Sequence, residues 1–290
     1  MTGRALIESC VEHNKHVVAI IRPGTKRKER LKKFENRIDV VECDLKDINK
    51  VVLPTKVYDT FFHIGWEVMS QKDRNGPIMQ SMNIMYTLNA VDVAKKYGCN
   101  KFVGVGSQAE YGKVSGIITP DLDEHPETAY GISKLAANKL SNMLCQRNGI
   151  KHIWGRIFSE YGCYDNEYTM LSYAFRQFVS KQKAFFSAAT QTWNYLNEKD
   201  VGEMLFLLGE TDVAEGIYHI ANTESKVLKE YIEEFADVFD AKELCVYAKT
   251  DEMQGAFDLI VDMDKTVKAI EYVPQITFRR GAEIIKERKM

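Results

Sequence analysis

The strongest constraint on the fold is an alternation of short apolar runs with helical patterns over the first 160 residues. Nearly continuous apolar runs are typical of strands that are covered on both faces. Helical segments between such strands predict right-handed βαβ units and a parallel sheet. We expect strands at 16–21, 38–41, 57–64, 101–105 and 151–157, helices at 3–13, 77–97 and 129–146, and a charged helix or loop at 26–35.

The alternation weakens after about residue 160, which indicates a second, smaller α+β lobe. In an open α/β sheet, ligands bind at the carboxyl ends of the strands, so we expect the lobe to pack there. The predicted domains are 1–160 plus 192–222 and 161–191 plus 223–290. Within the second half we expect helices at 168–182, 198–208, 226–239 and 279–289, strands at 216–221 and 244–248, and an irregular segment at 184–196.

Composition excludes several classes of protein. The 290 residues are 45% hydrophobic and carry a net charge of −2, so no global basic bias points to a nucleic-acid partner. Six cysteines without C-x-x-C spacing argue against a zinc knuckle or disulfide framework and favour a cytoplasmic location. We find neither a signal-peptide pattern nor a membrane-spanning apolar run. The histidines show no ligand spacing, so no metal site is predicted.

Three residues carry a pattern that suits carbonyl–alcohol redox chemistry. Ser107 follows an apolar run, and Tyr130 and Lys134 lie four apart on a predicted helix, which places them on one face. The phenol can give or take the hydroxyl proton, and the lysine cation can lower the phenol pKa from its reference value near ~10. The serine hydroxyl can polarise the carbonyl. Chance pairs of this spacing are common, so the rest of the chain must supply a nicotinamide site.

Further motifs occur in order along the chain. They are Asp44-Leu45; Phe62-His63-Ile64-Gly65; the helix segment that runs from Asn83 to Asn89; Ser107-x-x-x-Tyr111-Gly112; Tyr130-x-x-x-Lys134; the segment from Arg156 to Gly162; Trp193 to Val201; and Gly216 to Asn222. Together they resemble the extended short-chain dehydrogenase/reductase family, in its nucleotide-sugar epimerase/dehydratase group. The resemblance implies a Rossmann-like doubly wound parallel sheet with a smaller substrate lobe, a nucleoside-diphosphate-sugar substrate, and a homodimer formed by helices 77–97 and 130–147.

The N-terminus departs from this family pattern. Members open with a strand and a Gly-rich turn whose backbone N–H groups hold the cofactor pyrophosphate at a helix N-terminus. Here Gly3 matches the last glycine of that turn, and the first strand and first two glycines are absent. We expect that the chain starts at an internal methionine of a longer reading frame; the alternative is a real loss of the phosphate cradle. Either way, the sheet should lack a central strand.

The cofactor is expected to be NADP or NAD, with NADP favoured. An NAD site places an acid at the end of the second strand, whereas here Ile21 stands there and Arg22 follows, which suits a 2′-phosphate. The basic run at 26–30 is interpreted instead as a solvated charged segment. The resemblance implies cofactor contacts from Gly3, Arg22, Asp44, Leu45, His63, Ile64, Gly65, Asn83, Val105, Tyr130, Lys134 and Ile157, and catalysis by Ser107, Tyr130 and Lys134.

The residues after Ser107 discriminate between reactions. Related 4,6-dehydratases carry an Asp-Glu pair there, whereas this chain has Gln108 and Ala109, which cannot act as acids. Dehydration is therefore disfavoured, and a 4-keto reductase is favoured over a 4-epimerase. The alternative is a non-catalytic sensor or scaffold with the same fold. Residues expected to contact the sugar nucleotide are Trp66, Gln108, Ser159 and Tyr195.

Overall fold

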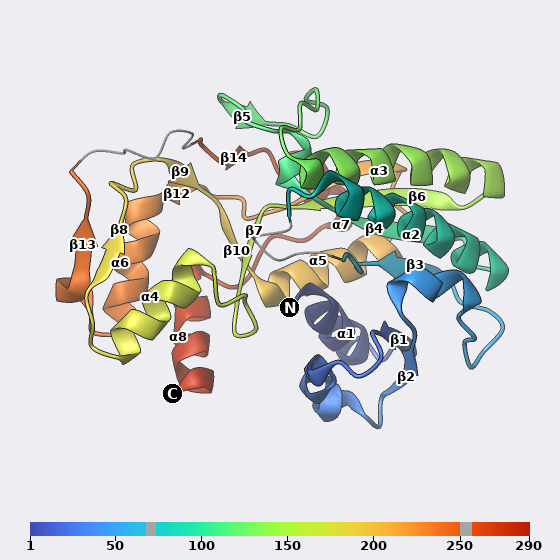
Figure 1. Cartoon of the computed structure of the whole chain (residues 1–290), viewed down its shortest axis with the longest axis horizontal. Helices are drawn as coiled ribbons and strands as arrows, with labels where there is room; N and C mark the ends of the chain where they lie inside the picture. The colour runs from blue at the N-terminus through green and yellow to red at the C-terminus, as the bar shows by residue number, and fades with distance from the viewer. Residues whose placement is uncertain (68–73, 250–256) are drawn as a thin grey trace.

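The computed structural model describes residues 1–67, 74–249 and 257–290 and has the predicted α/β architecture. Its larger part is a layered α/β domain, and a smaller lobe of helices and short strands lies beside it (Figure 1). The central sheet has four parallel strands in the order β11-β6-β4-β3. These strands are β3 (Thr60–His63), β4 (Lys101–Ser107), β6 (Lys151–Ile157) and β11 (Gly216–Ile220).

Strand β4 lies in the middle of this sheet and carries the first candidate catalytic residue at its carboxyl end. Every residue of β4 is buried, as its apolar run predicts. Its last residue, Ser107, is in register with Ile157 at the end of β6. The strand that leads to His63 is shorter than predicted, because Tyr58 donates its N–H to the carbonyl of Tyr97 instead of to a neighbouring strand.

The sheet is interrupted where the sequence predicts a missing central strand. Strands β1 (Val17–Ile21) and β2 (Ile38–Glu42) form a separate parallel pair. In the described residues this pair shares no strand ladder with the four-stranded sheet. Strands β1 and β3 line the same cavity, so each presents an open edge toward it. The expectation that the sheet lacks a central strand is therefore confirmed.

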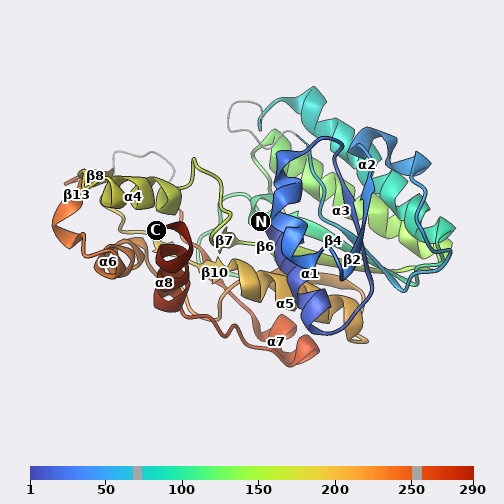
Figure 2. The ribbon, with the colours of Figure 1, turned by 90° about the horizontal axis from the view of Figure 1, so that it is seen from below.

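Helices cover both faces of the four-stranded sheet. Helices α2 and α3 pack against each other on one face, while α1 and α5 pack together on the other, with α7 beside α5 (Figures 1 and 2). Gly202 of α5 allows this close approach, because a Cβ there would lie 2.9 Å from the backbone nitrogen of Leu6. The bounds are α1 (Thr2–Glu12), α2 (Pro77–Lys96), α3 (Ala129–Asn148), α5 (Glu198–Glu210) and α7 (Asp264–Ile270).

The smaller lobe has its own apolar core, in which Tyr231, Phe235 and Phe278 meet the short strands. Its strands pair as β7–β10, β8–β13 and β9–β12, while β5–β14 forms a separate pair. The segment predicted to be irregular thus holds three short strands. The remaining elements are η1 (Lys26–Phe34), η2 (Leu45–Lys50), η3 (Gln108–Glu110), η4 (Lys242–Leu244), α4 (Met170–Val179), α6 (Leu228–Val238), α8 (Phe278–Lys289), β5 (Ile117–Ile118), β7 (Ser159–Tyr161), β8 (Ala184–Phe186), β9 (Thr192–Trp193), β10 (Tyr195–Asn197), β12 (Lys226–Val227), β13 (Cys245–Tyr247) and β14 (Ile260–Val261).

Candidate active site

Ser107 occupies a tight, well-satisfied turn between β4 and η3. Its hydroxyl accepts a hydrogen bond from the Ala109 N–H at 3.2 Å, and its own N–H donates to Oε1 of Glu110 at 2.8 Å. The two bonds form a capping box, which ends the strand and turns the chain. The Ser107 side chain is therefore held at the carboxyl edge of the sheet, where ligands bind in this class of fold.

Tyr130 lies in the first turn of α3, the helix directly beside this turn. Thr128 caps α3 by accepting the Gly131 N–H at 3.0 Å. Gly131 permits the close contact, because a Cβ there would stand 3.0 Å from the carbonyl carbon of Ala109. The structure thus brings Tyr130 close to Ser107, whose hydroxyl lowers the pKa of the phenol. Burial acts more strongly in the opposite direction and raises the pKa of this phenol.

Lys134 lies one helical turn after Tyr130 and is also buried. Its ammonium donates to the carbonyl of Val105 at 2.6 Å and lies 3.8 Å from the centre of the Trp66 ring. Burial lowers the pKa of Lys134 to about 7, although the carboxylate of Glu110 opposes this shift. The ammonium is 6.0 Å from the centre of the Tyr130 ring.

A second cation, Arg74, was missed by the sequence analysis. Its guanidinium lies 4.2 Å from the centre of the Tyr130 ring and lowers the pKa of that phenol. From the sequence, we expected Lys134 alone to lower the pKa of the phenol. Arg74 lies between β3 and α2, in a part of the sequence that has no motif. Its position beside Tyr130 is therefore evident only in the folded chain.

One cavity of about 1060 Å³ joins these residues to the open edges of β1 and β3. Most of the predicted cofactor contacts line it, including Gly3, Arg22, Leu45, His63, Ile64, Gly65, Val105, Tyr130, Lys134 and Ile157.

His63 is buried with Nε2 3.1 Å from the Thr87 hydroxyl. Burial lowers its pKa to about 3, so the ring is neutral near pH 7. Arg27, Lys28 and Arg30 also line the cavity, so the basic run is more than a solvated face.

Two predicted cofactor residues do not line this cavity. Asp44 caps η2 by accepting the Lys46 N–H at 3.1 Å. Asn83 is buried in α2 and binds the backbone of Glu67 through both its oxygen and its amide nitrogen. Both side chains shape segments that border the cavity, and Asn83 fixes the stretch that carries Trp66.

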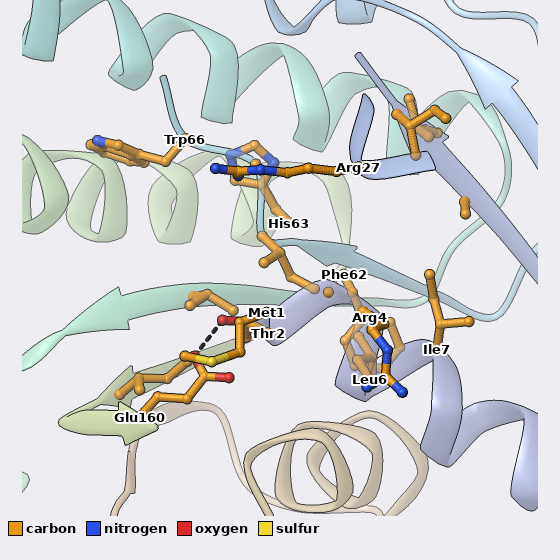
Figure 3. Close-up of a pocket in the computed structure, with 18 of the residues that line it drawn as sticks. Met1, Thr2, Arg4, Leu6, Ile7, Arg27, Phe62, His63, Trp66 and Glu160 are labelled. Atoms are coloured by element: carbon orange, nitrogen blue, oxygen red, sulfur yellow. Dashed lines mark hydrogen bonds between the residues drawn. The ribbon is translucent and has the colours of Figure 1, made fainter. Parts of the chain in front are cut away.

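The residues at the N-terminus of α1 lie at the other side of the cavity (Figure 3). The Thr2 hydroxyl donates to Oε2 of Glu160 at 2.6 Å, drawn as a dashed line in Figure 3. Burial raises the pKa of Glu160 to about 7. Gly3 lies beside Ile64, and a Cβ there would make an ordinary van der Waals contact with it, 3.8 Å from Cδ1. The start of a helix suits an anionic group, as a dinucleotide phosphate would be.

The predicted sugar contacts all line the same cavity: Trp66, Gln108, Ser159 and Tyr195. Trp66 is fixed by a 2.9 Å bond from its indole N–H to Gln80 and packs edge-on against Tyr130. Tyr195 packs against Tyr161 and Tyr231 in the smaller lobe, so the cavity extends to both parts of the chain. Gln108 and Ala109 supply no carboxylate, and the nearest one in sequence, Glu110, is fully buried beneath Ser107.

Comparison with known proteins gives the family. A family model described as the NAD-dependent epimerase/dehydratase family matches residues 1–221. The chain belongs to this family. The resemblance expected from the motifs is therefore confirmed, and the prediction that the protein is an enzyme is confirmed at the level of the family.

Two curated relatives match with low identity. An uncharacterised protein of Methanocaldococcus jannaschii is 24% identical over 280 residues, which cover 88% of this chain and 80% of that protein. GDP-6-deoxy-D-mannose reductase of Pseudomonas aeruginosa is 25% identical over 195 residues, which cover 62% of this chain and 63% of that enzyme.

Solved structures share the fold. UDP-N-acetylglucosamine 4-epimerase from Methanobrevibacter ruminantium, in complex with UDP-N-acetylmuramic acid, has a TM-score of 0.87 at 16% identity and covers 99% of this chain and 96% of its own. The protein RMD from Pseudomonas aeruginosa, complexed with NADPH, has a TM-score of 0.79 at 18% identity. The match covers 94% of this chain and 98% of that chain. At these identities the likeness establishes the Rossmann-like fold alone.

Two features are absent from the residues that the structure describes. These residues contain no helix that is long and apolar enough to cross a membrane. They also contain no group of three or more His, Cys, Asp or Glu side chains that could hold a metal ion.

Proposed function

We propose that this protein is an NADP-dependent oxidoreductase of nucleoside-diphosphate sugars that reduces a 4-keto carbon. The observation that carries the proposal is the Ser107, Tyr130 and Lys134 arrangement at the carboxyl edge of β4, facing a cavity large enough for a dinucleotide and a sugar nucleotide. GDP-6-deoxy-D-mannose reductase, a relative by sequence, supports the substrate class.

The side chains divide the work as follows. Ser107 hydrogen-bonds the substrate carbonyl oxygen, and Tyr130 gives its phenolic proton to that oxygen. Arg74 and Lys134 hold positive charge near the phenol and so favour loss of the proton. A bound nicotinamide supplies the hydride chemistry. Lys134 also lines the cavity, where its ammonium is held by the carbonyl of Val105. In that position it can hydrogen-bond a bound cofactor and orient it.

Reduction is favoured over epimerisation by the cofactor preference, and both are favoured over dehydration. Arg22 follows β1, is exposed and lines the cavity, so its guanidinium can pair with a 2′-phosphate. A reductase exchanges NADPH with solution, whereas a 4-epimerase keeps its cofactor and reverses the same hydride transfer. Dehydration would need acid–base groups at positions 108 and 109, which the chain lacks.

The test is net consumption of NADPH. The purified protein is given NADPH or NADH with a nucleoside-diphosphate 4-keto-6-deoxy sugar, and absorbance is followed at the nicotinamide band. We expect stoichiometric oxidation of NADPH and a slower reaction with NADH. Interconversion of 4-epimers without net oxidation would replace the reductase assignment by the epimerase. Cofactor binding without either reaction, across keto sugars and their 4-hydroxyl counterparts, would favour the sensor.

We also propose that the protein is a homodimer in which α2 and α3 of each copy face their counterparts. Both helices expose large apolar side chains, although they pack against each other within the chain. An apolar outer stripe on a helix pair suits a four-helix interface. The exposed side chains are Ile78, Met79, Met82 and Met85 on α2 and Ile132, Leu140 and Met143 on α3.

A further inference from the structure

Glu110 is a buried carboxylate to which the proposed reaction assigns no part. It has no exposed surface, and its two oxygens are held by three different groups. Oε1 accepts the Ser107 N–H at 2.8 Å, and both oxygens accept the indole N–H of Trp154 at 3.0 and 3.1 Å. Oε2 accepts from Nε of Arg156 at 2.8 Å. Burying a carboxylate costs desolvation free energy, which these three donors offset. Such a group, buried directly beneath a candidate catalytic serine, suggests a role in the site.

The local sequence is arranged to admit this carboxylate. Trp154 of β6 lies across Gly104 and Gly106 of β4, and a Cβ at Gly106 would stand 2.8 Å from Cδ1 of the indole. A side chain at either glycine would displace the indole that donates to Glu110. The Ser-x-x-Glu spacing then closes the capping box around Ser107.

A second branch of the same network reaches the segment that leads into α3. Arg156 is fully buried and also donates to Oε1 of Glu124 at 2.8 Å. Glu124 lies four residues before Thr128, the residue that caps the helix of Tyr130. Glu110 is thus bonded directly to the Ser107 backbone. Through Arg156 it is also linked to Glu124, in the segment that precedes α3.

We propose that Glu110 is a positioning residue that holds Ser107 and the start of α3 in one catalytic geometry and places a buried negative charge near Lys134. This inference rests on the proposed function for its kinetic consequences. Lys134 is faced, in the part of the chain that the structure describes, by Glu110, Arg74, Tyr130 and His63. The Lys134 ammonium donates to the carbonyl of Val105, and Glu110 accepts from the N–H of Ser107, two residues further along β4. Of the groups that face Lys134, Glu110 opposes the lowering of its pKa.

Two substitutions separate geometry from charge. Glu110→Asp keeps the charge but shortens the side chain, so the carboxylate can no longer reach Ser107 and Arg156 together. Glu110→Gln keeps the length and removes the charge. Glu127→Gln is the matched control, because Glu127 is exposed and its closest ion pair is with Lys113 at 3.5 Å.

The first readout is steady-state kinetics with NADPH and the keto sugar. For Glu110→Asp we expect kcat to fall about 10–100-fold, as for other residues that orient a catalytic group, with KM within about twofold. Glu127→Gln should match the wild type. Equal kcat in Glu110→Asp and the wild type would overturn the positioning role, and so would a loss confined to KM.

The second readout needs no substrate and decides the inference even if no keto sugar is turned over. The Lys134 side-chain signal is titrated by NMR in protein labelled at lysine Cε, with Lys134→Met to assign it. Glu110→Gln should move the Lys134 pKa below its wild-type value of about 7, while Glu110→Asp leaves it near that value. An unchanged pKa in Glu110→Gln would overturn the charge role. If Glu110→Gln fails to fold, the Glu110→Asp kinetics still decide the positioning role.

Discussion

The packing of Trp154 across β4 leads to a prediction that can be worked from distances. A Cβ added at Gly104 would lie closer than 3.0 Å to two ring carbons of Trp154, nearer than real Cβ atoms approach other groups. Trp154 is fully buried and Gly104 is buried in the middle of the sheet, so neither can move into solvent. Overpacking of this kind costs about 1–3 kcal/mol, and we expect Gly104→Ala to lower the free energy of unfolding by about 3 kcal/mol.

Trp154→Leu should relieve that clash. The single variant loses buried area and the indole bond to Glu110, but in the double variant the new methyl group occupies space that the ring has left. The free energies of unfolding should therefore be non-additive, with a coupling of about 1–3 kcal/mol in favour of the double variant.

The coupling is measured by urea unfolding of the wild type, the two single variants and the double variant. The denaturant dependence m should be the same in all four, so that the free energies can be compared. Gly3→Ala is the control, because the added Cβ would meet only Ile64 at 3.8 Å and a helical alanine should raise stability by about 1 kcal/mol. Additivity within about 0.5 kcal/mol, or a Gly104→Ala variant as stable as the wild type, would refute this account of the strand.

Three other outcomes are expected. Arg22→Ala should raise the Kd for NADPH about tenfold and leave that for NADH unchanged in fluorescence titrations, since only the phosphate pairs with the guanidinium. Burial lowers the pKa of His152 and of His219 to about 4. The unfolded chain therefore binds more protons between pH 6.5 and 4, and stability measured by urea titration should fall over that window by about 3 kcal/mol for each ring. Joint replacement of Met82 and Met143 by lysine should reduce the mass measured by light scattering from that of two chains to 33.2 kDa, whereas a wild type that is already monomeric would contradict the dimer.

The sequence predicted much of this structure because apolar runs and helical periods are local signals. The strand that ends at Ser107 and the helix with Tyr130 and Lys134 follow from such patterns, whereas the interrupted sheet follows from the resemblance to the family, whose first strand this chain lacks. Glu110 could also have been predicted in part, because Ser-x-x-Glu is a capping-box spacing that a closer inspection would have recognised.

The rest depends on contacts between distant segments. Arg74 reaches the Tyr130 ring, and Trp154 reaches Glu110, only because β3, β4 and β6 lie side by side. The protonation of Lys134 likewise depends on its burial beneath Trp66, which no spacing in the chain encodes. Propensity and periodicity describe neighbours in sequence and therefore miss these groups.

The most direct measurement of the proposed activity is turnover by Tyr130→Phe. The phenylalanine ring fills the same buried place beside Trp66 but has no proton to give. We predict that kcat for NADPH-dependent reduction falls by about 10²–10⁴-fold or more, while the Kd for NADPH stays within about threefold. Turnover by Tyr130→Phe at the wild-type rate would contradict the assignment of Tyr130 as the proton donor, and with it the proposed reaction.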